Sequence, residues 1–294
     1  MWGRRLAWSR LRDLGCVIDW NQYKEYLLKT HHKSSLRYLF TYAKKYCYIL
    51  ENPIEAKDLL MMNDAKRRLV MSSLANLSKY LGLYDQWKNT IKEFDLKWDK
   101  PDALRSIISL LNTNLDDIKQ WLFNALEKLP KDAATIIAFL SLTGLRVTES
   151  SSSISLIIKL SEQNKLDEYL DRDLMMLQHF KYSQFLRRSK NAFISFISKD
   201  LLNLILQYKP SLNHDDLKSR LRKRGLKIKL KYLRKMHGTL LRDKGIPSEF
   251  IDIVHGRINS SLFARCYYRP LLNEMRNKVM EAIRPLEKEI LSYF

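Results

Sequence analysis

The sequence predicts a mainly α-helical protein with a small antiparallel β-sheet, arranged as an N-terminal helical bundle followed by a second, larger domain. Apolar residues recur at helical spacing over most of the 294 residues. Residues 192–197 form an apolar run typical of a strand buried on both faces. A segment containing Pro101 separates the two helical regions, and we assign residues 101–114 as the linker. A chain of this length accommodates two domains of ordinary size.

The charge balance points to a polyanionic partner. Lysine and arginine total 52 against 32 acidic residues, a formal net charge of +20. Such a surplus predicts binding to nucleic acid or to an anionic membrane. No apolar run approaches the ~20 residues of a membrane span, and the first residues carry arginines without the apolar core of a secretory signal. We therefore predict nucleic acid as the partner and no membrane association.

The cysteines and histidines predict neither disulfides nor a metal site. The three cysteines form no Cys-x-x-Cys pair, and an odd count argues against a disulfide framework. This indicates a reducing compartment, the cytoplasm, or the host-cell cytoplasm if the protein is virus-encoded. The six histidines have no zinc-binding spacing relative to the cysteines. We expect no metal and no cofactor.

The N-terminal part begins with a basic stretch and continues as helices. Residues 1–19 are basic and aromatic without a clear period, which fits either a DNA-contacting arm or a frayed terminus. Residues 20–100 show helical periodicity, with a break at Asn52-Pro53 and a C-cap at Gly82. The polar faces are rich in Lys and Arg. They fit a DNA-binding bundle, or simply a solvated surface.

The second domain, residues 115–285, opens with two predicted helices over residues 115–129 and 133–142. Arg146 follows the second helix and a glycine turn, and a charge placed against a core needs a partner. That partner is either Glu149 or a DNA phosphate, and we favour the phosphate. The serine-rich residues 150–155 predict a turn, with a helix resuming at Ile154.

A lysine lies near the tip of a predicted β-hairpin. Residues 182–187 and 192–197 flank a short polar turn that contains Lys190. Lys181, Arg187 and Arg188 are neighbouring cations that compete with Lys190 for any role at the tip.

The most basic run of the chain follows an apolar helix over residues 200–208. It contains no acid between Lys218 and Lys235. A basic run of this kind recognises phosphate rather than base sequence. We predict that it lies along the duplex backbone through Arg220, Arg222, Lys223, Arg224, Lys227 and Lys229.

Residues 231–268 predict two helices and a loop that ends in two tyrosines. Lys231, Arg234 and His237 are one turn apart and share a helix face. Gly245 ends the first helix, and Gly256 ends the second, directly before Arg257. His237 and His255 fit either the core or a site. Tyr267 and Tyr268 close the loop.

These residues resemble the motifs of the tyrosine recombinase (phage integrase) family, most closely the integrases of archaeal viruses and plasmids. Thr143-Gly144-Leu145-Arg146 with Glu149 is similar to the family's first arginine box. Lys231-Tyr232-Leu233-Arg234 stands where the family has His-x-x-Arg, and Gly256-Arg257 where it has Gly-His. Tyr267 stands where the nucleophile would. Lysine and arginine in place of the two histidines are the features that resemble the archaeal members.

The resemblance implies a tyrosine-recombinase (DNA breaking-rejoining) catalytic domain at residues 115–285, a core-binding DNA clamp at residues 20–100 and a short tail at residues 286–294. Arg146 and Arg234 would hold the non-bridging oxygens of the cleaved phosphate. Lys190 would be the general acid, and Lys231 and Arg257 would assist with phosphate binding. Tyr267 would form a 3′-phosphotyrosine link, with Tyr268 as the alternative nucleophile.

The family further implies double-stranded DNA as the partner, and strand exchange through a Holliday junction by a homo-tetramer on paired sites, the free protein being a monomer or dimer. Two other functions fit the same residues: a type IB topoisomerase-like nicking-closing enzyme, and a DNA-binding protein that has lost the chemistry. Residues 271–294 predict an amphipathic helix that is broken at Pro285. This segment would dock either on a neighbouring protomer or on its own domain.

Overall fold

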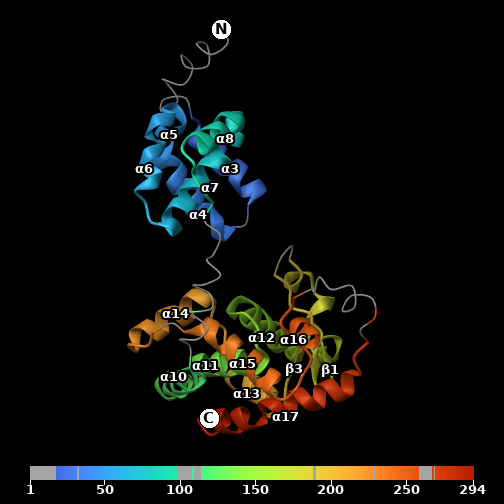
Figure 1. The fold of residues 1–294 in the computed structure, drawn as a ribbon. Coiled ribbons are helices and arrows are strands. Elements are labelled where there is room, and N and C mark those ends of the chain that lie inside the picture. Colours follow the sequence, from blue (N-terminus) through green and yellow to red (C-terminus); the bar gives the residue numbers. More distant parts are fainter. Residues whose placement is uncertain are drawn as a thin grey trace. The chain divides into compact units, whose positions relative to one another are not determined.

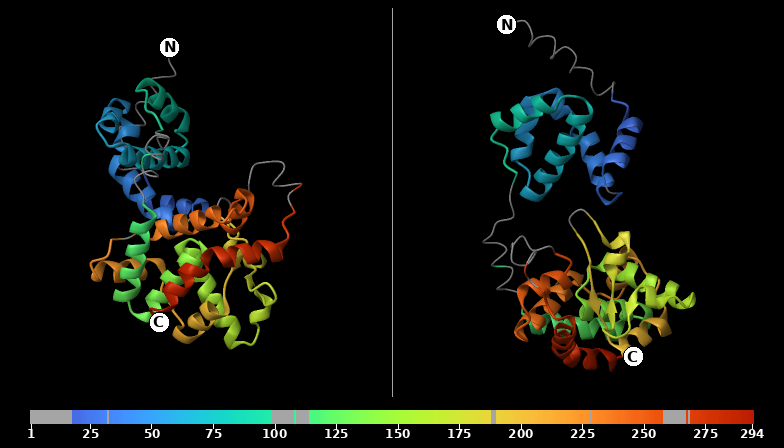
Figure 2. Two further views of the ribbon diagram at one scale, coloured as in Figure 1. Left: turned by 60° about the horizontal axis from the view of Figure 1, so that its bottom comes forward. Right: turned by 90° about the vertical axis from the view of Figure 1, so that its right-hand side faces the viewer.

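A computed structural model describes residues 18–31, 33–98, 108, 114–187, 190–227, 229–257, 267 and 269–294. The chain divides into two compact units, Met1–Leu110 and Leu111–Phe294, and the division falls inside the segment expected to be the linker. Figures 1 and 2 show both units as mainly helical. This confirms the predicted class, mainly α with a small antiparallel sheet. The expected N-terminal arm lies outside the described residues apart from Ile18 and Asp19.

The N-terminal unit is a helical bundle closed by an aromatic core. Its elements are α3 (Trp20–Thr30), α4 (Lys33–Tyr46), α5 (Tyr48–Glu51), η1 (Pro53–Ala56), α6 (Lys57–Leu60), α7 (Asp64–Tyr80) and α8 (Tyr84–Glu93). Asp19 and Asn63 cap α3 and α7 by accepting backbone N–H bonds. Tyr23 is fully buried and packs against Tyr26, Phe40 and Tyr80. The bundle therefore has a hydrophobic core of its own.

The C-terminal unit is built around a helix that is buried along almost its whole length. This helix, α11 (Lys131–Thr143), has every residue from Ala133 to Thr143 buried. The helices around it are α10 (Leu115–Lys128), α12 (Val147–Glu162), α13 (Lys199–Tyr208), α14 (His214–Lys223), α15 (Leu230–Asp243), α16 (Ser248–Val254) and α17 (Leu272–Leu291). Its apolar composition and the left-handed Gly144 (φ +65°) that ends it explain both its burial and its sharp exit.

The sheet differs from the predicted hairpin. It has three short antiparallel strands, β1 (Leu170–Asp171), β2 (Met176–Leu177) and β3 (Ser195–Phe196), in the order β1-β2-β3. The prediction of a hairpin between residues 182–187 and 192–197 was wrong, because β3 pairs with β2 and Ser183–Phe185 is a 3-10 turn.

A buried polar chain explains the difference. The Tyr169 hydroxyl lies 2.9 Å from Ser153 Oγ and 2.6 Å from His179 Nδ1, and His179 Nε2 lies 2.9 Å from Ser195 Oγ. Satisfying these groups requires 3-10 turns at residues 179–181 and 183–185 rather than a strand.

Two further predictions about local structure were wrong. The serine-rich residues 150–155 lie within α12 instead of a turn, and Ser150 and Ser153 are buried where small side chains let helices approach. Pro285 does not end α17, which continues to Leu291. A proline inside a helix costs about 3 kcal/mol, and burial of Leu286 and Ile290 in the core offsets this cost.

Residues 286–294 consequently belong to the C-terminal unit instead of forming a separate tail. The Tyr293 ring stacks on Phe123 with centroids 5.7 Å apart, and the Phe294 ring lies 5.7 Å from Tyr208. The C-terminal helix thus packs on its own domain. Within the described residues, no helix is both long and apolar enough to cross a membrane.

Candidate active site

The turn between α11 and α12 places Arg146 at the surface of the buried core. Arg146 is the N-cap of α12, and its backbone N–H donates to Glu149 Oε2 at 2.9 Å. Its Nη1 donates to Glu149 Oε1 at 2.5 Å and to the Asn191 carbonyl at 3.2 Å. The Glu149 side chain is 1% exposed and that of Arg146 is 30% exposed. Of the two partners considered for Arg146, Glu149 is therefore present in the protein itself, and part of the guanidinium still faces solvent.

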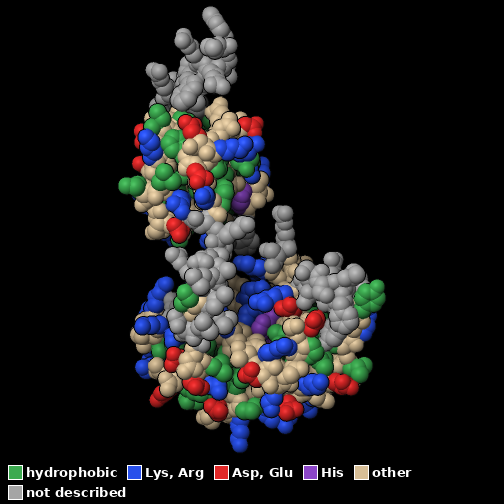
Figure 3. Space-filling model, viewed as in Figure 1, with side chains coloured by type: hydrophobic (Ala, Val, Ile, Leu, Met, Phe, Trp, Pro, Cys, Tyr) green, Lys and Arg blue, Asp and Glu red, His purple; other side chains and the backbone are tan. Residues whose placement is uncertain are grey.

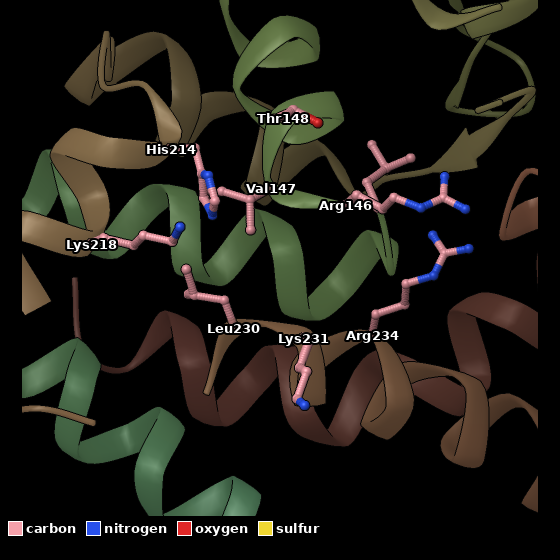
Figure 4. Close-up of a pocket in the computed structure, with 9 residues that line it drawn as sticks. Arg146, Val147, Thr148, His214, Lys218, Leu230, Lys231 and Arg234 are labelled. Atoms are coloured by element: carbon pink, nitrogen blue, oxygen red, sulfur yellow. The ribbon is translucent and has the colours of Figure 1, made fainter. Parts of the chain in front are cut away.

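Arg234 is held beside Arg146 by two helix ends. Its Nη1 donates to the Gly144 carbonyl at 2.8 Å, and its Nη2 donates to the His255 carbonyl. Gly144 and His255 are the C-caps of α11 and α16, where helix dipoles place partial negative charge. Burial, and next the charge of Arg146, lower the Arg234 pKa to about 10, so the side chain stays charged at neutral pH. Figure 4 shows the guanidinium groups of Arg146 and Arg234 on the same side of the pocket, facing one another.

The buried His237 and His255, hereafter the histidine pair, lie against the Gly144 turn that holds Arg234. Their rings are joined by a 3.0 Å contact between His237 Nδ1 and His255 Nε2. Burial, the largest cause, lowers the His237 pKa to about 3 and the His255 pKa to about 2, so both rings are neutral at physiological pH. A Cβ added at Gly144 would lie 2.5 Å from His237 Nδ1. The histidine pair therefore leaves no room for a side chain at the turn whose Gly144 carbonyl accepts from Arg234.

Gly256 brings the segment containing Lys190 against the end of α16. Its φ is +61°, and a Cβ built on it would lie 1.7 Å from the Asn191 carbonyl oxygen. That same oxygen accepts from Arg146. Lys190, next to Asn191, and Arg257, next to Gly256, are both exposed. Arg257 Nη1 lies 3.5 Å from Asp252 Oδ1, and its charge contributes to lowering the Arg234 pKa. The structure thus brings together Arg146, Arg234 and the chain segments that carry Lys190 and Arg257.

Lys231 and Tyr267, the other two residues predicted to be catalytic, are both exposed. Lys231 is exposed on α15, its Nζ is 5.0 Å from the Tyr232 ring centroid, and in Figure 4 it points away from the arginine pair. The Tyr267 side chain is 69% exposed. Among the described residues no hydrogen bond joins Tyr267 to the arginines, and Tyr268 lies outside the described part. The choice of Tyr267 as nucleophile stays a prediction.

The basic run divides into an anchored arginine and exposed cations. Arg220 Nη1 donates to both carboxylate oxygens of Asp132 at 2.8 Å, which ties α14 to the start of α11. The Trp121 indole donates to the Lys227 carbonyl at 2.7 Å and anchors the following loop. The remaining predicted DNA contacts are exposed, or half-buried for Lys229: Arg222, Lys223, Arg224, Lys227 and Lys229. Figure 3 shows Lys and Arg side chains at the edge of the C-terminal unit where Figure 1 labels α14.

Sequence reasoning did not select three residues that line a pocket next to the arginine pair. Thr148, His214 and Lys218 border a pocket of about 480 Å³ together with Arg146 and Arg234. The only feature of the sequence that could have pointed to these pocket residues was the position of Lys218 in the basic run.

The described residues contain no group of three or more His, Cys, Asp or Glu side chains suited to hold a metal ion.

Comparison with known families assigns most of the C-terminal unit to one family. Residues 110–280, more than half of the chain, match the archaeal phage integrase family. The chain therefore belongs to that family, which confirms the resemblance drawn from the motifs. No curated protein matches the chain. Family membership indicates a DNA recombinase of the integrase type, with DNA as its partner.

Proposed function

We propose that this protein is a site-specific recombinase that cleaves and rejoins DNA through a 3′-phosphotyrosine intermediate on Tyr267. The observation that carries the proposal is the pair of guanidiniums, Arg146 and Arg234, fixed side by side at the edge of a buried core. A rigid pair of planar forks suits the two non-bridging oxygens of one phosphodiester. Their anchors are made before substrate arrives, so little reorganisation accompanies the reaction.

In the proposed reaction, the Tyr267 oxygen attacks the phosphorus, and the bond from phosphorus to the 5′ oxygen breaks. The tyrosine proton leaves to a base or to solvent as the bond to phosphorus forms. Lys190 gives a proton to the departing 5′ oxygen. Arg257 and Lys231 add positive charge around the phosphate, and Lys231 first rotates away from the Tyr232 ring.

The phosphotyrosine link keeps the energy of the broken phosphodiester bond, so a 5′ hydroxyl of another strand can attack it and restore the backbone. This step needs no nucleotide hydrolysis. We propose that four protomers on two paired sites perform it twice, through a Holliday junction. The N-terminal bundle, with its own core, would serve as the DNA clamp.

Two-site recombination tests the proposal. A duplex selected for tight binding from a random-sequence pool is placed twice in a supercoiled plasmid. Recombinant products are expected with the wild-type protein, and none with Arg234→Ala. Relaxation of the plasmid without recombinants would favour the topoisomerase-like alternative. Tight binding with neither product would contradict the proposal and leave a DNA-binding protein on the same scaffold.

A further inference from the structure

The charged side chains that line the pocket beside the arginine pair are all cationic. The pocket is bordered by Arg146, Lys218, Lys231 and Arg234, and no carboxylate belongs to the lining. Three helices also begin at its wall, namely α12 at Val147, α14 at His214 and α15 at Leu230. Helix N-termini carry partial positive charge, and in α14 the Asn213 side chain already accepts from the N–H groups of Asp215 and Asp216. The pocket thus combines two independent sources of attraction for anions.

The pocket has two ends. In Figure 4, Arg146 and Arg234 lie on one side, and His214 and Lys218 lie on the opposite side. The arginine end is taken by the cleaved phosphate in the proposed function. The other end has no part in that chemistry.

The side chains at the other end are suited to hold a phosphate. Lys218 Nζ lies 3.8 Å from Asp215 Oδ1, beyond hydrogen-bonding distance, and the Asp215 side chain is 90% exposed. A pair of this kind is weak, so the lysine charge remains available. Burial and then the Lys218 charge lower the His214 pKa, which leaves a neutral ring able to donate one hydrogen bond. The exposed Thr148 hydroxyl adds a donor of a type that commonly contacts phosphate.

We propose that Lys218, His214 and Thr148 form a second phosphate site, which holds the DNA-backbone phosphate next to the cleaved one. This assignment rests on the proposed function, because the arginine end of the pocket identifies the cleaved phosphate. A backbone segment with successive phosphates matches a pocket with two cationic ends, whereas a single free anion needs only one. The exposed Arg222 and Lys223 continue the positive charge along α14, which also favours an extended polyanion.

The salt dependence of DNA binding tests the site without requiring cleavage. The probe is a fluorescently labelled duplex of random sequence, and the slope of log K against log salt is measured by anisotropy. Each phosphate contact contributes about 0.9 to the slope on duplex DNA. Lys218→Ala is expected to reduce the slope by about 1. Thr148→Val should weaken binding and leave the slope unchanged, since it removes a hydrogen bond but no charge. The matched control is Lys278→Ala, an exposed lysine on α17 outside the pocket.

Equal slopes for Lys218→Ala, Lys278→Ala and the wild type, with all three folded by circular dichroism, would overturn the second site. Tyr267→Phe should keep the wild-type slope. If the proposed chemistry fails, the wild type does not cleave DNA, but its salt slope still differs from that of Lys218→Ala. If the second site fails, the two slopes are equal whether or not the wild type cleaves DNA.

The position of the second phosphate is tested after the cleaved bond is mapped. A neutral methylphosphonate replaces the neighbouring phosphate in the labelled duplex. It should weaken binding by the wild type and by Lys278→Ala, but cause no further loss in Lys218→Ala. If the methylphosphonate at this position weakens binding by Lys218→Ala as much as it weakens binding by the wild type, the lysine holds a different phosphate.

Discussion

Gly256 is the position where a single methyl group should damage both the fold and the proposed chemistry. In Gly256→Ala the new Cβ would lie 1.7 Å from the Asn191 carbonyl oxygen, and Cβ contacts shorter than 3.0 Å essentially never occur. The carbonyl must therefore move by at least 3.0 − 1.7 = 1.3 Å. Overpacking of this kind costs about 1–3 kcal/mol. The left-handed backbone at φ +61° adds about 1 kcal/mol for alanine, giving about 2–4 kcal/mol in all.

Gly245 supplies a matched control. Its φ is +70°, and a Cβ added there meets nothing within 4 Å. Gly245→Ala should therefore lose only the backbone contribution, about 1 kcal/mol. The difference between the two variants isolates the contact with Asn191.

The same displacement should slow DNA cleavage. The Asn191 carbonyl accepts from Arg146, and Asn191 directly follows Lys190 in the chain. Misplacing reacting groups by about 1 Å can cost about 100-fold in rate. Urea unfolding gives the stability, and the rate of covalent complex formation on a suicide duplex gives the chemistry. Equal stability and equal rates in Gly256→Ala and Gly245→Ala would refute the reasoning.

Three further predictions concern the anchoring of the site. Glu149→Ala should lower the free energy of unfolding by about 1–3 kcal/mol, because it leaves the Arg146 groups that it binds without their partner; an unchanged urea midpoint would contradict the anchoring role. Stability should fall from pH 7 to pH 5, because the histidine pair has pKa values of about 3 and about 2 when folded and about 6.5 when unfolded, so the unfolded chain takes up the protons. The loss should begin near the unfolded pKa and be smaller in His255→Gln, and a rise in stability over this interval would count against a neutral pair. Arg220→Ala should reduce stability by about 0.5–1 kcal/mol through its half-exposed ion pair, whereas Arg222→Ala should reduce only DNA affinity; the reverse pattern would exchange their roles.

Much of the C-terminal unit was predictable because its signals are local. The apolar run of α11 and the left-handed glycines that end helices each act within a few residues. The common face of Arg234 and His237 also follows from helical spacing alone. The arginine motifs themselves were identified by their resemblance to the motifs of the recombinase family.

The errors arose where tertiary contacts decide. The strands β1 and β2 are two residues each, too short for an alternating pattern. Burial carries α17 through Pro285, and the polar chain at Tyr169 replaces the expected hairpin. The pocket with His214 and Lys218 depends on three helix starts that converge only in space. The spacing of residues along the sequence could not reveal that the histidine pair packs against the Gly144 turn that holds Arg234.

Covalent trapping tests the central claim most directly. The wild type, Tyr267→Phe and Tyr268→Phe are incubated with a nicked or phosphorothiolate duplex that carries the selected binding site, and the products are run on a denaturing gel. The proposal predicts a protein–DNA band for the wild type and Tyr268→Phe, and none for Tyr267→Phe. A band lost only in Tyr268→Phe would move the nucleophile by one residue. No band from the wild type, on a site that it binds, would contradict tyrosine-mediated cleavage.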